Sequence, residues 1–198
     1  MLRNAGVLLV ALAAAGGIVY ARGASMRVGI PDATVSAPQV DVSPAASGVL
    51  RAVYVRTGDV VAPNAVVAEV GTQLLTAAGG GLVVSVNRQI GATFSPGQAV
   101  VALIDPSQLR VVGQADENKG LNRLRVGQAA DFTADAFGSR VFHGVVDEVS
   151  PTAQASGVVF NISDQRQTQI FDVKVRFDAS AYPELKNGMS ARLTVYTE

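Results

Sequence analysis

The chain has 198 residues, of which 48% are hydrophobic, and its 16 basic and 16 acidic residues give a formal net charge of zero. Without a basic stripe it offers nothing that a nucleic acid would bind, so we expect no nucleic-acid partner. The absence of cysteine excludes disulfides, thiolate metal sites, thiol catalysis and a lipid-modified N-terminal cysteine, but it selects no compartment.

The N-terminus carries an unbroken apolar run, residues 5–21 (AGVLLVALAAAGGIVYA). It stands at the lower limit for spanning a bilayer and exceeds the usual apolar core of a signal peptide. Cleavage after residues 19–21 remains an alternative, but Tyr20 and Arg22 resemble an interfacial flank and favour an uncleaved anchor. We therefore predict an N-terminal transmembrane helix in residues 1–24, with the rest of the chain extracytoplasmic at the cell membrane.

Residues 25–38 mix Gly, Ala, Ser and Pro with scattered valines and show no sustained period. Such a composition predicts a linker that passes into a first short strand. From Gln39 the hydrophobic period becomes two, and residues 49–55 (VLRAVYV) form a β-branched run of strand length, which predicts β-structure.

A stretch of sequence then occurs twice, as GVLRAVYVRTGDVVAPNAVVAEV in residues 48–70 and GLVVSVNRQIGATFSPGQAVVAL in residues 81–103. Two glycines, a proline and several valines recur at a constant offset of 33 residues. Two copies indicate one pseudo-symmetric sandwich, because neither copy can bury its apolar face alone. Structural turns at the starts of strands or between them are predicted at these glycines and prolines: Gly48, Gly58, Pro63, Gly81, Gly91, Pro96, Gly97, Gly127 and Gly188.

Between the copies lies the junction, residues 71–80 (GTQLLTAAGG), which begins with Gly71, Thr72, Gln73, Leu74 and Leu75. Glycines at both ends and the absence of a helical stripe predict a loop with at most a short strand.

A second β region follows, with strands expected at residues 109–114, 129–133, 140–149, 158–162, 169–177 and 190–196 and a hairpin tip at 163–168. Their spacing predicts a small antiparallel barrel, and the polar residues 115–124 contain one plausible helical turn. Asp147 and Glu148 are adjacent in a predicted strand and are therefore expected on opposite faces.

No catalytic or metal constellation emerges. His143 stands alone in a strand and is interpreted as a surface or structural residue, and Asp131 and Asp135 as solvated charges that do not converge on a metal. The three glycines 79–81 open a strand and therefore do not form a phosphate-binding loop. Because no serine elbow, HExxH motif or P-loop is present either, we expect no enzyme activity and no cofactor.

The paired half-motifs are similar to the two halves of the lipoyl or biotinyl carrier fold. Together with LRVGQAADFTADAF and LKNGMSARLTVY, they resemble the HlyD-type periplasmic adaptor, or membrane fusion protein, family from about residue 40 onward. The resemblance implies an all-β chain: a lipoyl-like barrel-sandwich hybrid in residues 39–106, then a small antiparallel β-barrel in residues 107–198, behind the anchor and the linker.

Two departures from these families matter. Carrier domains display a modified lysine at the hairpin that joins their halves, and the junction contains none. Typical adaptors insert a long α-helical hairpin there to reach an outer-membrane channel, and this chain has about ten residues instead. The resemblance thus implies a short form that lacks the hairpin.

The expected function is that of a non-catalytic, membrane-anchored adaptor of an ABC-type or related exporter. Its partners would be an inner-membrane transporter, the membrane itself and, in a ring, further copies of the chain. Two alternatives stay open: an envelope-bound binding or sensing module without a transporter, and a biotinyl- or lipoyl-type carrier domain of an enzyme complex.

Overall fold

The computed structural model describes residues 27–153 and 169–197, and all regular structure in them is β-strand apart from three short 3-10 turns. The predicted all-β class is confirmed. Within the described residues no helix is long and apolar enough to cross a membrane. The predicted transmembrane helix, the strand at 158–162 and the hairpin tip at 163–168 lie outside the described residues.

The described chain divides into two units. The barrel unit comprises residues 27–35, 110–153, 169–177 and 188–197, and the sandwich unit comprises residues 36–109 and 178–187. The return of residues 178–187 to the sandwich unit corrects the expectation that everything after residue 107 belongs to the barrel. Leu185 explains the return, because its side chain is buried, and Asn187 accepts a hydrogen bond from the Ala37 amide at 3.0 Å.

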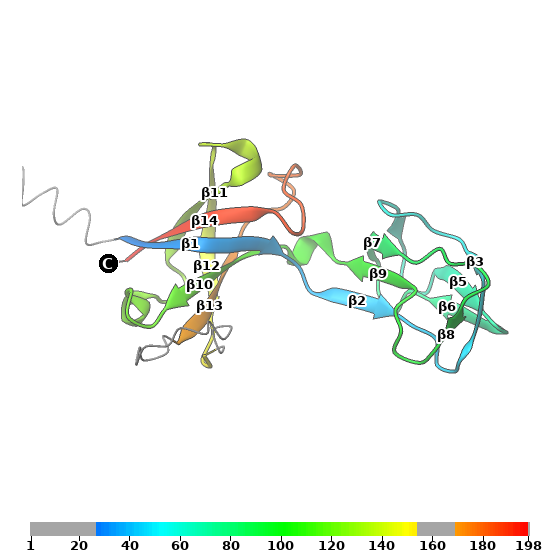
Figure 1. Cartoon of the computed structure of the whole chain (residues 1–198). Helices are drawn as coiled ribbons and strands as arrows, with labels where there is room; N and C mark the ends of the chain where they lie inside the picture. The colour runs from blue at the N-terminus through cyan, green and yellow to red at the C-terminus, as the bar shows by residue number, and fades with distance from the viewer. Residues whose placement is uncertain (1–26, 154–168, 198) are drawn as a thin grey trace, which may run out of the picture. The chain divides into compact units, whose positions relative to one another are not determined.

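The barrel is closed by six antiparallel strands in the order β1-β10-β13-β12-β11-β14 (Figure 1). Their bounds are β1 (Arg27–Ser36), β10 (Arg110–Asp116), β11 (Ala129–Ala134), β12 (Val141–Val149), β13 (Ile170–Arg176) and β14 (Ser190–Tyr196). Three aromatic side chains fill much of the interior, since the Phe132 ring lies 5.3 Å from that of Phe142 and 5.4 Å from that of Phe177. The predicted small antiparallel barrel is present.

Strand β1 corrects the linker prediction for residues 25–38. Gly29, Pro31 and Asp32 hid this strand, because Pro and Asp are depleted in strands. Its pairing with β14 shifts register between Ile30 and Ala33, so that Pro31 and Asp32 fall in an irregularity where a proline needs no ladder partner.

A second irregularity corrects the prediction for Asp147 and Glu148. The pairing of β12 with β13 shifts between Val146 and Glu148, and this bulge interrupts the alternation of faces. Both carboxylates are solvent-facing: Asp147 binds Arg110 at 3.1 Å and Glu148 binds Lys174 at 2.9 Å.

The sandwich unit contains two four-stranded sheets, with orders β2-β9-β7-β4 and β6-β5-β3-β8. The strands are β2 (Gln39–Val42), β3 (Gly48–Val53), β4 (Val60–Val61), β5 (Val66–Val70), β6 (Gln73–Thr76), β7 (Gly81–Val86), β8 (Thr93–Phe94) and β9 (Val101–Ile104). Each sheet combines two strands from the first half of the unit with two from the second.

The strand pairing repeats residue by residue between the two halves. Gly48 pairs with Phe94, and Gly81 pairs with Val61. Adding 33 to the residue number in the first half and subtracting 33 from the residue number in the second half converts one pair into the other. The same operation relates the β3–β5 pairing to the β7–β9 pairing, including a register shift after Leu50 and after Val83. The duplication therefore specifies strand register as well as fold.

The core of the sandwich repeats in the same way. Its buried side chains include six pairs at an offset of 33: Val42 and Leu75, Leu50 and Val83, Val61 and Phe94, Val67 and Val100, Ala68 and Val101, and Val70 and Leu103. Within a pair the volume often differs, as for Val61 and Phe94, so the two halves fill one shared interior with complementary sizes.

Gly81 has no room for a side chain, and Gly81→Ala should therefore destabilise the protein. A Cβ at this position would lie 2.5 Å from the Ile104 carbonyl oxygen, which is backbone in the adjacent strand β9. We expect a loss of about 1–3 kcal/mol in the free energy of unfolding, measured by urea denaturation.

Gly79→Ala is the matched control, because nothing lies within 4 Å of a Cβ built there. Equal stability of the two variants would contradict the close approach of β7 and β9.

Candidate functional site

The junction between the repeats is a tight β-hairpin. Strands β5 and β6 are joined by Gly71 and Thr72 alone, and the pair Val70–Gln73 closes the turn. Gly71 has φ of +61°, which favours glycine at this position. The expected short strand is thus β6, and the remainder of the junction consists of that turn and residues 77–80.

Hydrogen bonds hold the junction against the loop that precedes β3. The Gln73 side-chain oxygen accepts from the amides of Ala45 at 3.0 Å and Ala46 at 3.2 Å, and its nitrogen donates to the Ala46 carbonyl at 3.0 Å. Leu75 is buried, whereas Leu74 is 60% exposed beside the turn. The sequence alone did not indicate the role of Gln73, because its partners lie more than 25 residues away.

The chemistry of a covalent carrier is missing from this turn. The lysines of the chain are Lys119, Lys174 and Lys186, and none lies in the junction or in either repeat. Gly71 and Thr72, which occupy the turn, offer no amine for attachment of a lipoyl or biotinyl group.

The other predicted turn residues fall into two groups. Positive φ values occur at Gly58 (+96°), Gly91 (+88°), Gly97 (+82°), Gly127 (+91°) and Gly188 (+91°). Gly48 and Gly81 instead begin strands β3 and β7, and Pro63 and Pro96 lie in turns before β5 and β9.

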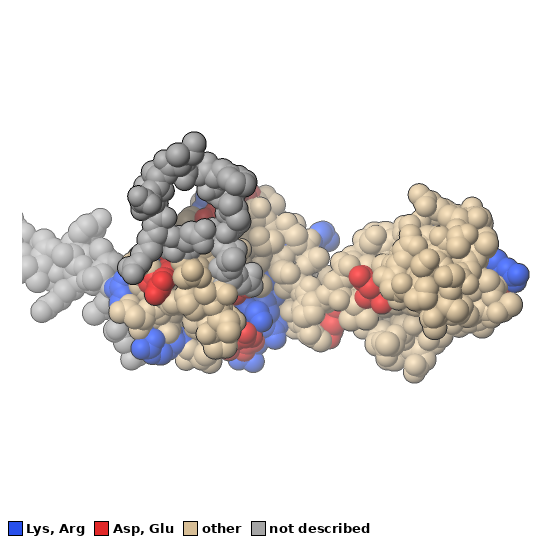
Figure 2. Space-filling model, turned by 60° about the horizontal axis from the view of Figure 1, so that its bottom comes forward, with Lys and Arg blue, Asp and Glu red and all other residues tan. Residues whose placement is uncertain are grey.

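The surface of the sandwich unit is poor in charge. On the face drawn in Figure 2 this unit shows only a few acidic and basic groups, whereas the barrel carries more groups of both signs. Several large apolar side chains of this unit are exposed, with Val60 at 81% and Tyr54 at 56%. The hydroxyl of Tyr54 donates to Glu69, and this hydrogen bond raises the pKa of Tyr54.

The same unit contains a largely apolar groove of about 660 Å³. Leu82 and Ile104 of the sheet line one part of it, and Pro183 and Leu185 of the returning segment line another. Lys186 is the one charged residue that lines it, and a largely apolar surface of this kind suits association with another protein.

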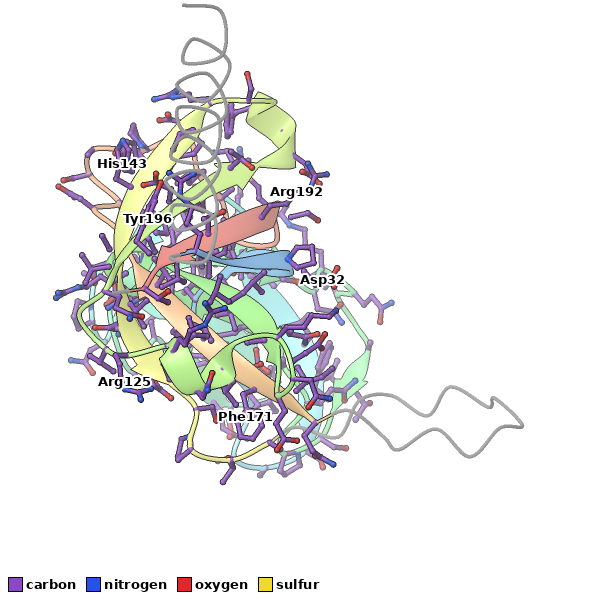
Figure 3. The ribbon with its side chains drawn as sticks, turned by 90° about the vertical axis from the view of Figure 1, so that its left-hand side faces the viewer. Asp32, Arg125, His143, Phe171, Arg192 and Tyr196 are labelled. Carbon is purple, nitrogen blue, oxygen red and sulfur yellow. The ribbon has the colours of Figure 1, made fainter. Side chains whose placement is uncertain are left out.

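Asp131 on β11 is the centre of a small polar cluster on the barrel. Its carboxylate accepts a hydrogen bond from the Tyr196 hydroxyl at 2.7 Å and lies 2.7 Å from His143 Nδ1. Figure 3 labels these two partners, His143 and Tyr196. Partial burial alone would raise the pKa of Asp131, but the bonds from Tyr196 and His143 outweigh it and lower that pKa. The hydrogen bond to Asp131 in turn raises the pKa of Tyr196.

These contacts refine the reading of the acidic residues. Asp131 is part of a hydrogen-bonded cluster, whereas Asp135 pairs with Arg192 at 3.2 Å, so the two carboxylates have different partners. Among the described residues no group of three or more His, Cys, Asp or Glu side chains is placed to hold a metal ion. His143 is 71% exposed and has no nucleophile among its hydrogen-bond partners in the described structure.

Comparison with known proteins gives a consistent fold. No protein-family model and no curated protein sequence matches the chain. Among solved structures, MacA from Actinobacillus actinomycetemcomitans has a TM-score of 0.73 at 15% identity over 87% of this chain and 79% of that one. The membrane fusion protein Spr0693 from Streptococcus pneumoniae R6 has a TM-score of 0.61 at 15% identity, and the periplasmic adaptor protein EmrA 0.57 at 13%, each over 87% of this chain and 99% of the other.

The chain therefore has the fold of membrane fusion and periplasmic adaptor proteins. The resemblance inferred from the motifs is confirmed at this level.

Gly91→Val should lower stability by about 1 kcal/mol or more, because a β-branched side chain is strained at a φ of +88°. Gly91→Asn should cost less, since asparagine tolerates the left-handed region better. Urea denaturation of both variants compares the costs, and unchanged stability of Gly91→Val would contradict the assigned turn.

Asp131→Asn should lower the pKa of Tyr196 toward its ordinary value of 10.0, because the acceptor charge is removed. Tyrosine ¹³Cζ chemical shifts across a pH titration measure this change, and Tyr54, which bonds Glu69, is the internal control.

The same variant tests the linkage to stability. The folded-state pKa of Asp131 lies below its ordinary value of 3.8, so its ionised form stabilises the protein above that pH. The stability advantage of the wild type over Asp131→Asn should be present at pH 7 and shrink as the pH falls through the folded-state pKa. An advantage that grows on acidification would contradict the assignment.

Proposed function

We propose that this protein is a non-catalytic, membrane-anchored, extracytoplasmic adaptor subunit of an exporter, of the ABC type or a related kind. The observation that carries the proposal is the combination of a pseudo-symmetric lipoyl-like sandwich with a six-stranded barrel in one chain. EmrA, a periplasmic adaptor protein, and Spr0693, a membrane fusion protein, share this fold over most of the chain.

The sequence supports the anchor. The apolar run of residues 5–21 has spanning length and ends shortly before β1 begins at Arg27. An anchor at this place tethers the barrel directly to the membrane, where an inner-membrane transporter is the natural partner. A ring of copies around that transporter is part of the proposal.

The junction limits the reach of the adaptor. With β5 and β6 joined by two residues, the sandwich has no helical extension at that position to contact a distant outer-membrane channel. The exposed apolar residues and the groove of the sandwich unit are the surfaces that we propose for protein contacts.

The alternatives make different demands on the chain. A carrier domain needs a lysine at the turn occupied by Gly71 and Thr72, which argues against that role. An envelope-bound binding or sensing module needs only the anchor and a binding surface. Detection of a transporter partner would therefore distinguish the adaptor from this module.

Site-specific photo-crosslinking in native membranes tests the adaptor role. A photoreactive amino acid at Val60 or Leu74, which are 81% and 60% exposed, should capture a transporter subunit that mass spectrometry identifies. The same amino acid at Lys174, which pairs with Glu148 on the outer surface of the barrel, is the matched exposed control.

Three outcomes would count against the proposal. Capture of no transporter from any apolar position, with the chain fully membrane-bound, would favour the binding or sensing module. An intact mass that carries a lipoyl or biotinyl group would favour the carrier. A mature N-terminus that begins after Ala21 would contradict the anchor.

A further inference from the structure

The sandwich unit has two outer faces, one on each sheet, and they differ although the repeat relates them. Both sheets pack on one shared core, so these faces point to opposite sides of the sandwich. Ala52 pairs with Glu69 in one sheet as Ser85 pairs with Ala102 in the other, at the offset of 33 residues. Positions on the two faces can therefore be compared one by one.

The outer face of β6-β5-β3-β8 carries three long side chains, Arg51, Tyr54 and Glu69, which we call the raised cluster. Glu69 points outward, because its neighbours Ala68 and Val70 on β5 belong to the core. Its carboxylate pairs with Arg51 at 3.4 Å and accepts a hydrogen bond from the Tyr54 hydroxyl at 3.2 Å. Tyrosine and arginine are enriched among the residues that contribute most to protein–protein binding, so the raised cluster is a candidate contact surface.

The equivalent positions on β2-β9-β7-β4 carry smaller side chains. Four pairs at the offset of 33 have the larger member on the raised side: Arg51 and Val84, Tyr54 and Asn87, Val66 and Ala99, and Glu69 and Ala102. Three of the smaller residues line a hollow of about 510 Å³, and the fourth, Val84, lines the apolar groove described above. The hollow and the groove share Gln39 and Ser85, so they adjoin each other.

The hollow contains two charged groups, Asp41 and Arg88, that the sandwich does not neutralise. Asp41 accepts a hydrogen bond from Gln39 at 2.7 Å, and Arg88 donates to the Val55 carbonyl at 3.2 Å. Within the described part of the chain, no ion pair joins either of these side chains to another residue. A surface that carries one charge of each sign would complement them.

The raised cluster of a second copy is such a surface. It carries one basic and one acidic group, Arg51 and Glu69, beside Tyr54. It protrudes at the positions where the hollow is recessed, because one repeat offset relates the larger residues to the smaller ones. Since the two faces point to opposite sides of the sandwich, each copy offers one to a neighbour on either side, and head-to-tail contacts of this kind can close into a ring.

We propose that the raised cluster of one copy docks into the hollow of the next. Arg51 would pair with Asp41 of the next copy, and Glu69 would pair with its Arg88. The Tyr54 ring would lie against the small side chains that line the hollow. The proposal rests on the ring of copies in the proposed function, and it assigns the residues that would form the contact.

The transporter would use other parts of the same unit. Leu74 and Val60, the positions chosen above for photo-crosslinking, lie on β6 and β4. Both are edge strands of their sheets, and neither residue belongs to the raised cluster or lines the hollow. Contact between copies and contact with a transporter can therefore be measured separately.

Disulfide crosslinking tests the contact without background, because the chain contains no cysteine. Two full-length chains with different affinity tags are co-expressed, one with Tyr54→Cys and the other with Ser85→Cys, and are oxidised in native membranes. We expect a covalent dimer that carries both tags, because Ser85 lines the hollow that would receive Tyr54. Ile90→Cys in place of Ser85→Cys is the matched control and should give no such dimer, since Ile90 is 58% exposed but does not line the hollow.

Charge reversal tests the pairing of Arg51 with Asp41. Arg51→Asp in the Tyr54→Cys chain should lower the yield of the two-tag dimer about tenfold, because two acidic groups would then face each other. Asp41→Arg in the Ser85→Cys chain should also lower the yield by itself, and it should restore the yield when both reversals are combined. Loss of folding would not be rescued by a substitution in a different chain, and urea denaturation of each variant checks that it is folded.

The other outcomes overturn defined parts of the proposal. A dimer between two Tyr54→Cys chains, as abundant as the two-tag dimer, would replace the head-to-tail contact by a symmetric one. An unchanged yield with Arg51→Asp would overturn the assigned charge pairing. Absence of the two-tag dimer would overturn the contact, and the adaptor role would survive it if Val60 still captures a transporter. A two-tag dimer in membranes where no transporter is captured would support the contact and count against the adaptor role.

Discussion

The exchange of strands between the two repeats is the constraint on which the sandwich depends. Strand β2 of the first half pairs with β9 of the second, and β6 of the second half pairs with β5 of the first. Each sheet is therefore incomplete without both copies, and the shared core of paired positions such as Val67 and Val100 cannot form from one alone. Because the side-chain period of a strand is two, a slip by one residue in either copy would turn its core residues outward.

This constraint also shows where the sandwich can accept a longer or shorter connection. By the repeat offset, the end of β5 at Val70 corresponds to Leu103 in β9, near the point where the chain leaves for the barrel. After β9 the chain leaves the sandwich and continues to β10 of the barrel. After Val70, Gly71 and Thr72 instead return the chain directly into β6. A change of reach at that turn need not disturb the core, since the turn contributes none of its buried residues.

Local chemistry determined how much could be predicted from the sequence. The turns at Gly58 and Gly91 and the strands they separate follow from residues within a few positions, and the constant offset made the pairing of the halves evident. Strand β1 was missed because Pro31 and Asp32 are strand breakers, and only its partner β14 shows that they occupy an irregularity. The roles of Gln73, Asp131 and Tyr196, and the return of residues 178–187, depend on contacts far apart in the chain, so periodicity carried no signal for them.

The distribution of charge suggests a division of roles between the two units. The repeats contain no lysine, and their surface exposes apolar residues such as Val60, which suits contact with another protein. Arginines and tyrosine gather at the end of the barrel where β1 begins and β14 ends, and the apolar N-terminal run attaches to that unit alone. Under the proposed function, the anchor would hold the barrel unit beside the membrane, where charged groups act over about one Debye length.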